Sequence, residues 1–172
     1  MHDLPPLAIR AAVPADLDAL HPLIERAYRG ESARGGWTHE ADLLEGERID
    51  RATLAALLDD PAERLLTAER NGELIGCVRV ADLGGGQAYL GLLCVAPELQ
   101  AGGVGRELIA AAERTARDTF GAKAIEMTVI ERRAELIAYY QRRGYALSGE
   151  RRDFPIPMSP PLFMAVLAKP LD

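Results

Sequence analysis

The middle of the chain carries an apolar strand pattern that runs through a glycine-rich stretch into an amphipathic helix pattern. Residues 88–95 form an apolar run, which predicts a central strand buried on both faces. Glycines follow at positions 102, 103 and 105, and from 104 to 120 apolar side chains recur at helical spacing. A strand followed by such a helix indicates a layered α/β arrangement, in which the helix packs back on the sheet.

Turn and cap residues divide the rest of the chain into further short elements. Asn71 and Gly72 separate two β-type runs at 64–69 and 73–80, and this residue pair suits a tight hairpin. Asp50 is placed to cap a short helix that ends before Pro61. The other patterns predict a strand at 9–12, a helix from 16 that Pro22 kinks or splits, an irregular stretch at 30–46, a strand at 124–130, a helix at 133–143, an extended piece that begins at 145–147 and a strand at 162–167. These elements predict one mixed α/β sheet.

Length and charge limit the classes of function. The 172 residues carry no internal repeat or interior linker, so a single domain over residues 1–172 is expected. The net charge of −6 argues against a nucleic-acid-binding surface, which would be basic. An acidic chain is compatible with a cationic partner such as an amine.

The cysteines and histidines lack the spacing of a disulfide framework or a metal site. Cys77 and Cys94 lie inside apolar runs, which favours a reducing compartment. His2, His21 and His39 are scattered, so no metal site is expected. The first residues lack a targeting pattern and no apolar run is long enough to cross a membrane, so we expect a cytoplasmic protein.

The glycine-rich stretch has the chemistry of an anion site. The first turn of a helix presents backbone N–H groups without partners and the positive end of the helix dipole, which together suit a pyrophosphate. Arg106 adds a positive charge beside it. The spacing is neither the Rossmann G-x-G-x-x-G nor a P-loop with its lysine. An ordinary glycine-rich turn before a core helix is the alternative interpretation.

Two motifs, in order, resemble those of the GNAT superfamily of N-acetyltransferases. The stretch V-A-P-E-L-Q-A-G-G-V-G at 95–105 is similar to the family's acetyl-CoA signature Q/R-x-x-G-x-G/A after a strand. The block L-I-A-Y-Y-Q-R-R-G-Y at 136–145 resembles the family's A-x-x-L/F-Y-E-x-x-G-F/Y segment. The resemblance covers about residues 9–167 and implies a single domain with a central mixed, mostly antiparallel sheet flanked by helices.

The resemblance also implies acetyl-CoA as co-substrate and assigns residues to it. Leu93, Cys94 and Val95 would pair with the pantetheine arm where two strands splay apart, and Cys94 itself is expected to be a neutral packing residue. Four arginines are candidates for the adenosine 3′-phosphate or for simple surface charge: Arg132, Arg133, Arg142 and Arg143. The residues expected around the pyrophosphate are Gln100, Ala101, Gly102, Gly103, Val104, Gly105 and Arg106.

Two further residues are candidates for proton transfer. Tyr140, four residues before Gly144, falls where the family often carries a tyrosine that protonates the leaving thiolate; a core aromatic is the alternative. Arg133 and Thr128 stand where many members carry asparagine or glutamate, so the usual base is in doubt. Glu126, on the same strand face as Thr128, is the candidate base. A solvated strand residue, with a water chain in place of a base, is the alternative.

The acceptor is expected to contact the variable segments. Trp37 and Glu40 lie in the 29–48 region, which commonly shapes the acceptor pocket in this fold; Trp37 is alternatively a loop anchor. Residues 150–154 are a possible second wall. The expected function is acetyl transfer to a primary amine, small or peptidyl, by direct attack in a ternary complex. A non-catalytic CoA-binding module and an acyltransferase using another acyl-CoA or an oxygen acceptor stay open, as does a homodimer.

Overall fold

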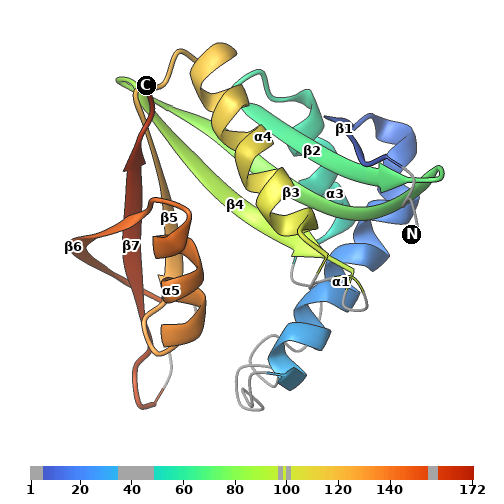
Figure 1. Ribbon diagram of the computed structural model, residues 1–172. Coiled ribbons are helices and arrows are strands. Elements are labelled where there is room, and N and C mark those ends of the chain that lie inside the picture. Colours follow the sequence, from blue (N-terminus) through green and yellow to red (C-terminus); the bar gives the residue numbers. More distant parts are fainter. Residues whose placement is uncertain (1–5, 35–48, 97–98, 100–101, 155–158) are drawn as a thin grey trace, which may run out of the picture.

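A seven-stranded mixed sheet forms the centre of the computed structural model, which describes residues 6–34, 49–96, 99, 102–154 and 159–172 (Figure 1). The strand order is β1-β2-β3-β4-β5-β7-β6, and β4–β5 is the parallel pair among otherwise antiparallel neighbours. This confirms the mixed, mostly antiparallel sheet. The strands are β1 (Ala8–Ala11), β2 (Glu63–Arg70), β3 (Glu73–Gly84), β4 (Gln87–Val95), β5 (Ala124–Ile130), β6 (Ala146–Asp153) and β7 (Phe163–Pro170).

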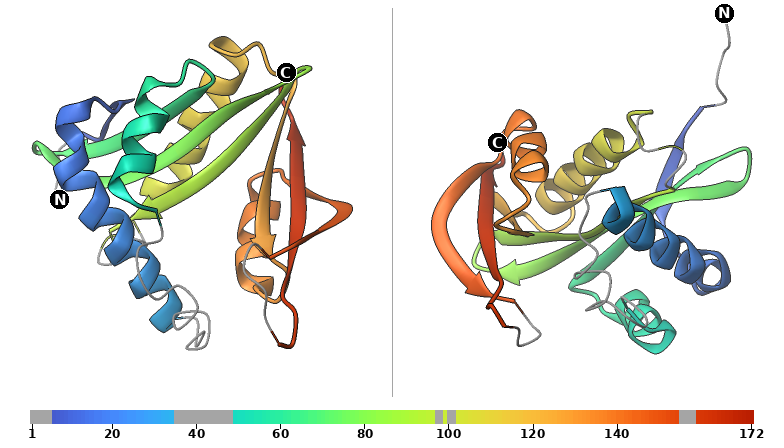
Figure 2. Two further views of the ribbon diagram at one scale, coloured as in Figure 1. Left: turned by 180° about the vertical axis from the view of Figure 1, so that it is seen from behind. Right: turned by 90° about the horizontal axis from the view of Figure 1, so that it is seen from below.

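Helices cover both faces of this sheet (Figure 2). On one face, α1 (Leu17–Arg34) and α3 (Arg51–Asp59) pack over the first four strands through Leu20, Ile24 and Leu54, which are fully buried. On the other face lie α4 (Val104–Asp118) and, over β5 and β7, α5 (Ala134–Arg142). The α4 face holds the larger core, in which Leu108 packs with strand residues such as Val78 and Ile125. The two-sided burial of the sheet explains why its central strands read as continuous apolar runs.

Several elements form where the sequence predicts them. Asn71 and Gly72 adopt φ values of 56° and 77° in the β2–β3 hairpin. Asp50 caps α3, since its side chain accepts a hydrogen bond of 2.7 Å from the backbone N–H of Thr53. Strand β5 has the bounds expected from its pattern. Helix α4 ends at Asp118, two residues before the predicted end.

One expectation is corrected. Pro22 does not split the first helix: α1 continues through it to Arg34, so the first residues of the expected irregular stretch are helical. Proline removes one backbone donor near the start of an 18-residue helix, and burial of the residues around it, such as Leu20 and Ile24, outweighs that loss. The extended piece expected to begin at 145–147 is confirmed as strand β6, which starts at Ala146 and has eight residues. None of the described helices is long and apolar enough to span a membrane.

Gly76 of β3 lies under α4 with no room for a side chain. A Cβ there would lie 2.9 Å from both the carbonyl oxygen of Cys94 and Cδ1 of Leu108. We expect Gly76→Ala to lower the free energy of unfolding by about 1–3 kcal/mol through overpacking, measured by urea denaturation. Gly91→Ala is the matched comparison, because its Cβ would meet side chains and no backbone atom among its nearest neighbours: the Tyr89 ring at 3.0 Å and Arg79 Nη1 at 3.8 Å. An equal loss in both variants would contradict the expectation.

Candidate active site

Strands β4 and β5 pair at one end and then separate. Their ladder runs from Gln87–Ala124 to Tyr89–Glu126, and beyond it Leu92 adopts a φ of 48°, which breaks the regular strand. The last part of β4 remains paired to β3 on its other side, for example through Cys77 and Cys94. Figure 1 shows the two strands diverging from their paired end. We call this separation the β4–β5 opening.

The last residues of β4 line this opening. Leu93 is half-buried, whereas Cys94 and Val95 are buried, and Leu93 and Val95 pack with the α4-side core. The backbone edge of β4 at these three residues therefore faces the opening, as the pantetheine prediction requires. The Cys94 side chain is buried and packs with the α1-side core.

The glycine-rich loop leads from the end of β4 to the first turn of α4. Gly103 is the N-cap residue with a φ of 81°, a conformation that strongly favours glycine. Its carbonyl oxygen accepts from the backbone N–H of Glu107 (3.1 Å), and Val104 anchors the turn in the core at 1% exposure. The guanidinium of Arg106 lies 3.4 Å from the position that a Cβ on Gly103 would occupy. Backbone donors, helix dipole and a cation therefore meet here, which suits a phosphate group.

Helix α5 carries two adjacent tyrosines beside this loop. Tyr140 is 7% exposed, and its ring packs edge-on against Tyr139 (5.4 Å between centroids) and Tyr145 (6.3 Å). Tyr140 thus belongs to the core cluster that includes Val95 and Val104, which line the opening and the loop. The core role and the proton-donor role predicted for Tyr140 are compatible in this position.

A partly buried polar network connects the end of α5 to α4. The Tyr145 hydroxyl donates to Glu113 (3.0 Å), and Lys169 Nζ donates to both Glu113 oxygens (3.0 and 3.2 Å) and to the Arg143 carbonyl (2.9 Å). Burial, and then the nearby Glu113 carboxylate, raise the pKa of Tyr145 well above its ordinary value, so the hydroxyl stays protonated at neutral pH. The network joins the middle of α4 to the chain at the end of α5 and to β7.

Glu126 lies on the face of the sheet opposite to α4 and α5. It belongs to the last β4–β5 residue pair before the opening, with Tyr89. Its Oε2 lies 2.8 Å from Nη1 of Arg152, and its Oε1 accepts from Gln87 Nε2 at 3.2 Å. Its side chain is 13% exposed, so the carboxylate is largely shielded from solvent. The bond to Glu126 is the main cause that raises the pKa of Arg152, which also pairs with Glu150 at 2.6 Å.

A pair of hydroxyls at the opening was not predicted from the sequence. Tyr89 Oη lies 2.7 Å from Oγ1 of Thr128, which joins β4 and β5 just past their last ladder pair. Arg79 stacks on the Tyr89 ring at 5.8 Å and is held by Glu63 through two bonds of 2.7 and 2.6 Å. The sequence held one signal for this pair. Tyr89 alternates with the buried residues Ala88 and Leu90, so its side chain lies on the face of the sheet opposite to α4.

Some of the remaining predicted site residues lie in the described part of the structure and others lie outside it. Arg133 is the N-cap residue of α5, partly exposed, on the side of the opening that follows β5. Gly102 is exposed, and Gly105 is the second residue of α4. As glycines, both can contact a ligand only through their backbone. Among the described residues no group of His, Cys, Asp and Glu could hold a metal ion. The predictions for Trp37, Glu40, Gln100 and Ala101 lie outside the described residues.

A strand opening that ends at a glycine-rich helix N-terminus defines a class of protein built to hold an extended ligand with a phosphate at one end. The model of the acetyltransferase (GNAT) family matches residues 18–145, and the chain belongs to that family. No curated protein matches the sequence.

Solved structures of the same fold are similar over nearly the whole chain. The ribosomal-protein-S18-alanine N-acetyltransferase of Escherichia coli is 18% identical with a TM-score of 0.74, over 96% of this chain and 94% of that chain. A chimera of the spermidine N-acetyltransferase SpeG from Vibrio cholerae and hSSAT is 20% identical with a TM-score of 0.73, over 96% and 95%. The acetyltransferase yncA of Salmonella typhimurium, solved with its cofactor acetyl-CoA, is 18% identical with a TM-score of 0.73, over 97% and 95%.

Proposed function

We propose that this acetyltransferase-family chain transfers the acetyl group of acetyl-CoA to a primary amine. The observation that carries the proposal is the β4–β5 opening, which leads directly to the glycine-rich first turn of α4. Leu93, Cys94 and Val95 would bind the pantetheine arm through their backbone. The residues proposed around the phosphates are Gln100, Ala101, Gly102, Gly103, Val104, Gly105 and Arg106, with Arg133 near the adenosine end.

In the proposed reaction the amine attacks the thioester carbonyl directly in a ternary complex. A C–N bond forms, the C–S bond breaks, and the electron pair leaves on the CoA sulfur. Tyr140 supplies the proton that this thiolate takes up, and the amine gives up its own proton to Glu126 or to water. Holding the two reactants together supplies much of the rate enhancement. Thr128 and Tyr89 lie near Glu126 on the same face and offer hydroxyls to such a proton path.

The proposed acceptor is a small-molecule or peptidyl amine. The structural relatives act on acceptors as different as a ribosomal-protein alanine and spermidine. The acidic chain favours a cationic acceptor over a nucleic-acid-bound one, and Trp37 and Glu40 remain candidates to contact it. A cytoplasmic location, and a homodimer, also remain proposals.

The test is an amine screen with acetyl-CoA that detects the free CoA thiol and the mass of the acetylated product. The proposal expects thiol release that depends on the amine, and a product heavier by one acetyl group. Binding of acetyl-CoA without release for any amine would instead support a non-catalytic CoA-binding module. Faster turnover with a longer acyl-CoA would assign a different acyl donor.

The proposed base, Glu126, can be tested against Glu150, a second glutamate that pairs with Arg152. We expect Glu126→Gln to lower kcat about a hundredfold, because the amide cannot accept the proton. Glu150→Gln is the control, since Glu150 also pairs with Arg152 but is 53% exposed. The measurement is the pH profile of kcat for both variants. If Glu126→Gln is as active as wild type, Glu126 is not the base, and the amine loses its proton to water.

A further inference from the structure

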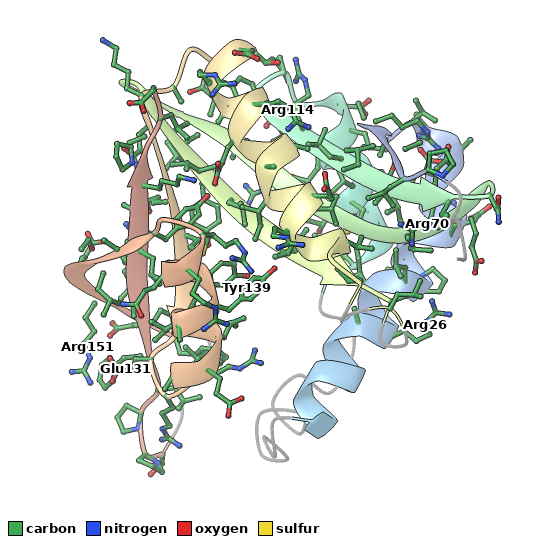
Figure 3. The ribbon with its side chains drawn as sticks, viewed as in Figure 1. Arg26, Arg70, Arg114, Glu131, Tyr139 and Arg151 are labelled. Carbon is green, nitrogen blue, oxygen red and sulfur yellow. The ribbon has the colours of Figure 1, made fainter. Side chains whose placement is uncertain are left out.

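A second tyrosine of α5, Tyr139, reaches across the β4–β5 opening. Its hydroxyl lies 3.3 Å from the position that a Cβ on Gly105 would occupy, and Cγ2 of Val95 lies 3.7 Å from the same position. Figure 3 shows the side chain projecting from α5 toward the lower end of α4. Since α5 follows β5 and α4 follows β4, this hydroxyl connects the two sides of the opening at the first turn of α4.

The Tyr139 hydroxyl and the Nε of Arg143 have no hydrogen-bond partner within the ranges that the structure describes. Tyr139 as a residue is partly exposed. The guanidinium of Arg143 stacks on the Tyr139 ring at 4.7 Å from its centroid. Arg143 Nε is itself buried without a hydrogen-bond partner among those residues. The Tyr139 hydroxyl therefore lies beside the positive end of a helix, with a cation stacked on its own ring, and an anionic ligand there would accept a hydrogen bond from it.

We infer that Tyr139 is a cofactor-binding residue, whose hydroxyl donates a hydrogen bond to the phosphate end of acyl-CoA at the α4 first turn. Arg143 is the positioning residue that holds the ring and adds positive charge. This inference rests on the proposed function. It divides the two tyrosines by role: Tyr139 contributes to affinity for CoA, and Tyr140 to the chemical step.

The test compares CoA binding to wild type and to Tyr139→Phe by calorimetric titration. The phenylalanine keeps the ring that packs on Tyr140 and under Arg143, so the unliganded variant should melt at the wild-type temperature. Loss of a hydrogen bond to a charged group should raise the Kd for CoA about tenfold. In turnover the same variant should raise KM for acetyl-CoA and leave kcat near wild type.

Three results would overturn the inference. An unchanged Kd in Tyr139→Phe, with CoA binding intact in wild type, would mean that the hydroxyl does not touch the cofactor and would leave the proposed function standing. A lower Kd would mean that the hydroxyl has to be displaced before CoA enters. Failure of wild type to bind CoA would overturn the proposed function together with this inference.

A second measurement tests the contact without any ligand. A Cβ added at Gly105 would lie 3.3 Å from the Tyr139 hydroxyl, so the change in melting temperature caused by Gly105→Ala in unliganded protein should depend on that oxygen. Because alanine is the better helix former, Gly105→Ala should be more favourable in the Tyr139→Phe background, where the crowded oxygen is absent, than in wild type. The same change in both backgrounds would contradict the placement of the hydroxyl.

Discussion

Gly103→Glu should abolish measurable acetyl-CoA binding. The substitution places a carboxylate where phosphate oxygens are proposed to bind, and glutamate disfavours the φ of 81° that presents the α4 amides. Hydrogen bonds to a charged group are worth about 1.5–3 kcal/mol each, so losing two of them would weaken binding about a hundredfold or more. Calorimetric titration of acetyl-CoA measures the effect.

Gly72→Glu is the matched control for this change. Gly72 has a φ of 77° in the β2–β3 hairpin, away from the α4 first turn, and a Cβ there would meet no atom within 4 Å. The control therefore introduces the same residue and a similar backbone strain without reaching the proposed phosphate site. It should bind acetyl-CoA as wild type does. If both variants lose acetyl-CoA binding equally, the loss is caused by unfolding. If Gly103→Glu binds acetyl-CoA as wild type does, the loop is an ordinary turn and not a phosphate site.

Tyr140→Phe should lower kcat about a hundredfold or more with little change in KM for acetyl-CoA. Without the phenol, the leaving thiolate has no proton donor at this position, while the ring still packs against Tyr139 and Tyr145. The measurement is steady-state kinetics with any amine that the screen identifies. An acyl donor with a more acidic thiol leaving group should narrow the difference from wild type, because such a thiolate needs less protonation.

Tyr139→Phe is the natural comparison, because it makes the same change one residue away. The two variants should separate, with the KM effect at Tyr139 and the kcat effect at Tyr140. A kcat effect at Tyr139 and none at Tyr140 would reverse the assignment of the proton donor. If both variants keep the wild-type kcat, neither tyrosine is the proton donor, and water protonates the thiolate.

Most of the elements could be predicted from local sequence because local chemistry determines them. The β2–β3 hairpin depends on Asn71 and Gly72, and the α3 start depends on Asp50, each within a few residues. The sequence predicts where strand β6 begins but not where it ends, because its eight residues are nearly all exposed and no apolar alternation marks them. Continuation of α1 through Pro22 likewise depends on burial against other elements, which a local pattern does not contain.

The sequence by itself determined the fold class, the glycine-rich helix start and the family resemblance, because each depends on residues close together in the chain. Only the tertiary structure decided which side chains meet at the opening. The ion pair of Glu126 with Arg152, the Tyr89–Thr128 hydroxyl pair and the approach of Tyr139 to Gly105 all join separate elements. Such contacts follow from strand order and helix packing, in which residues distant in sequence become neighbours.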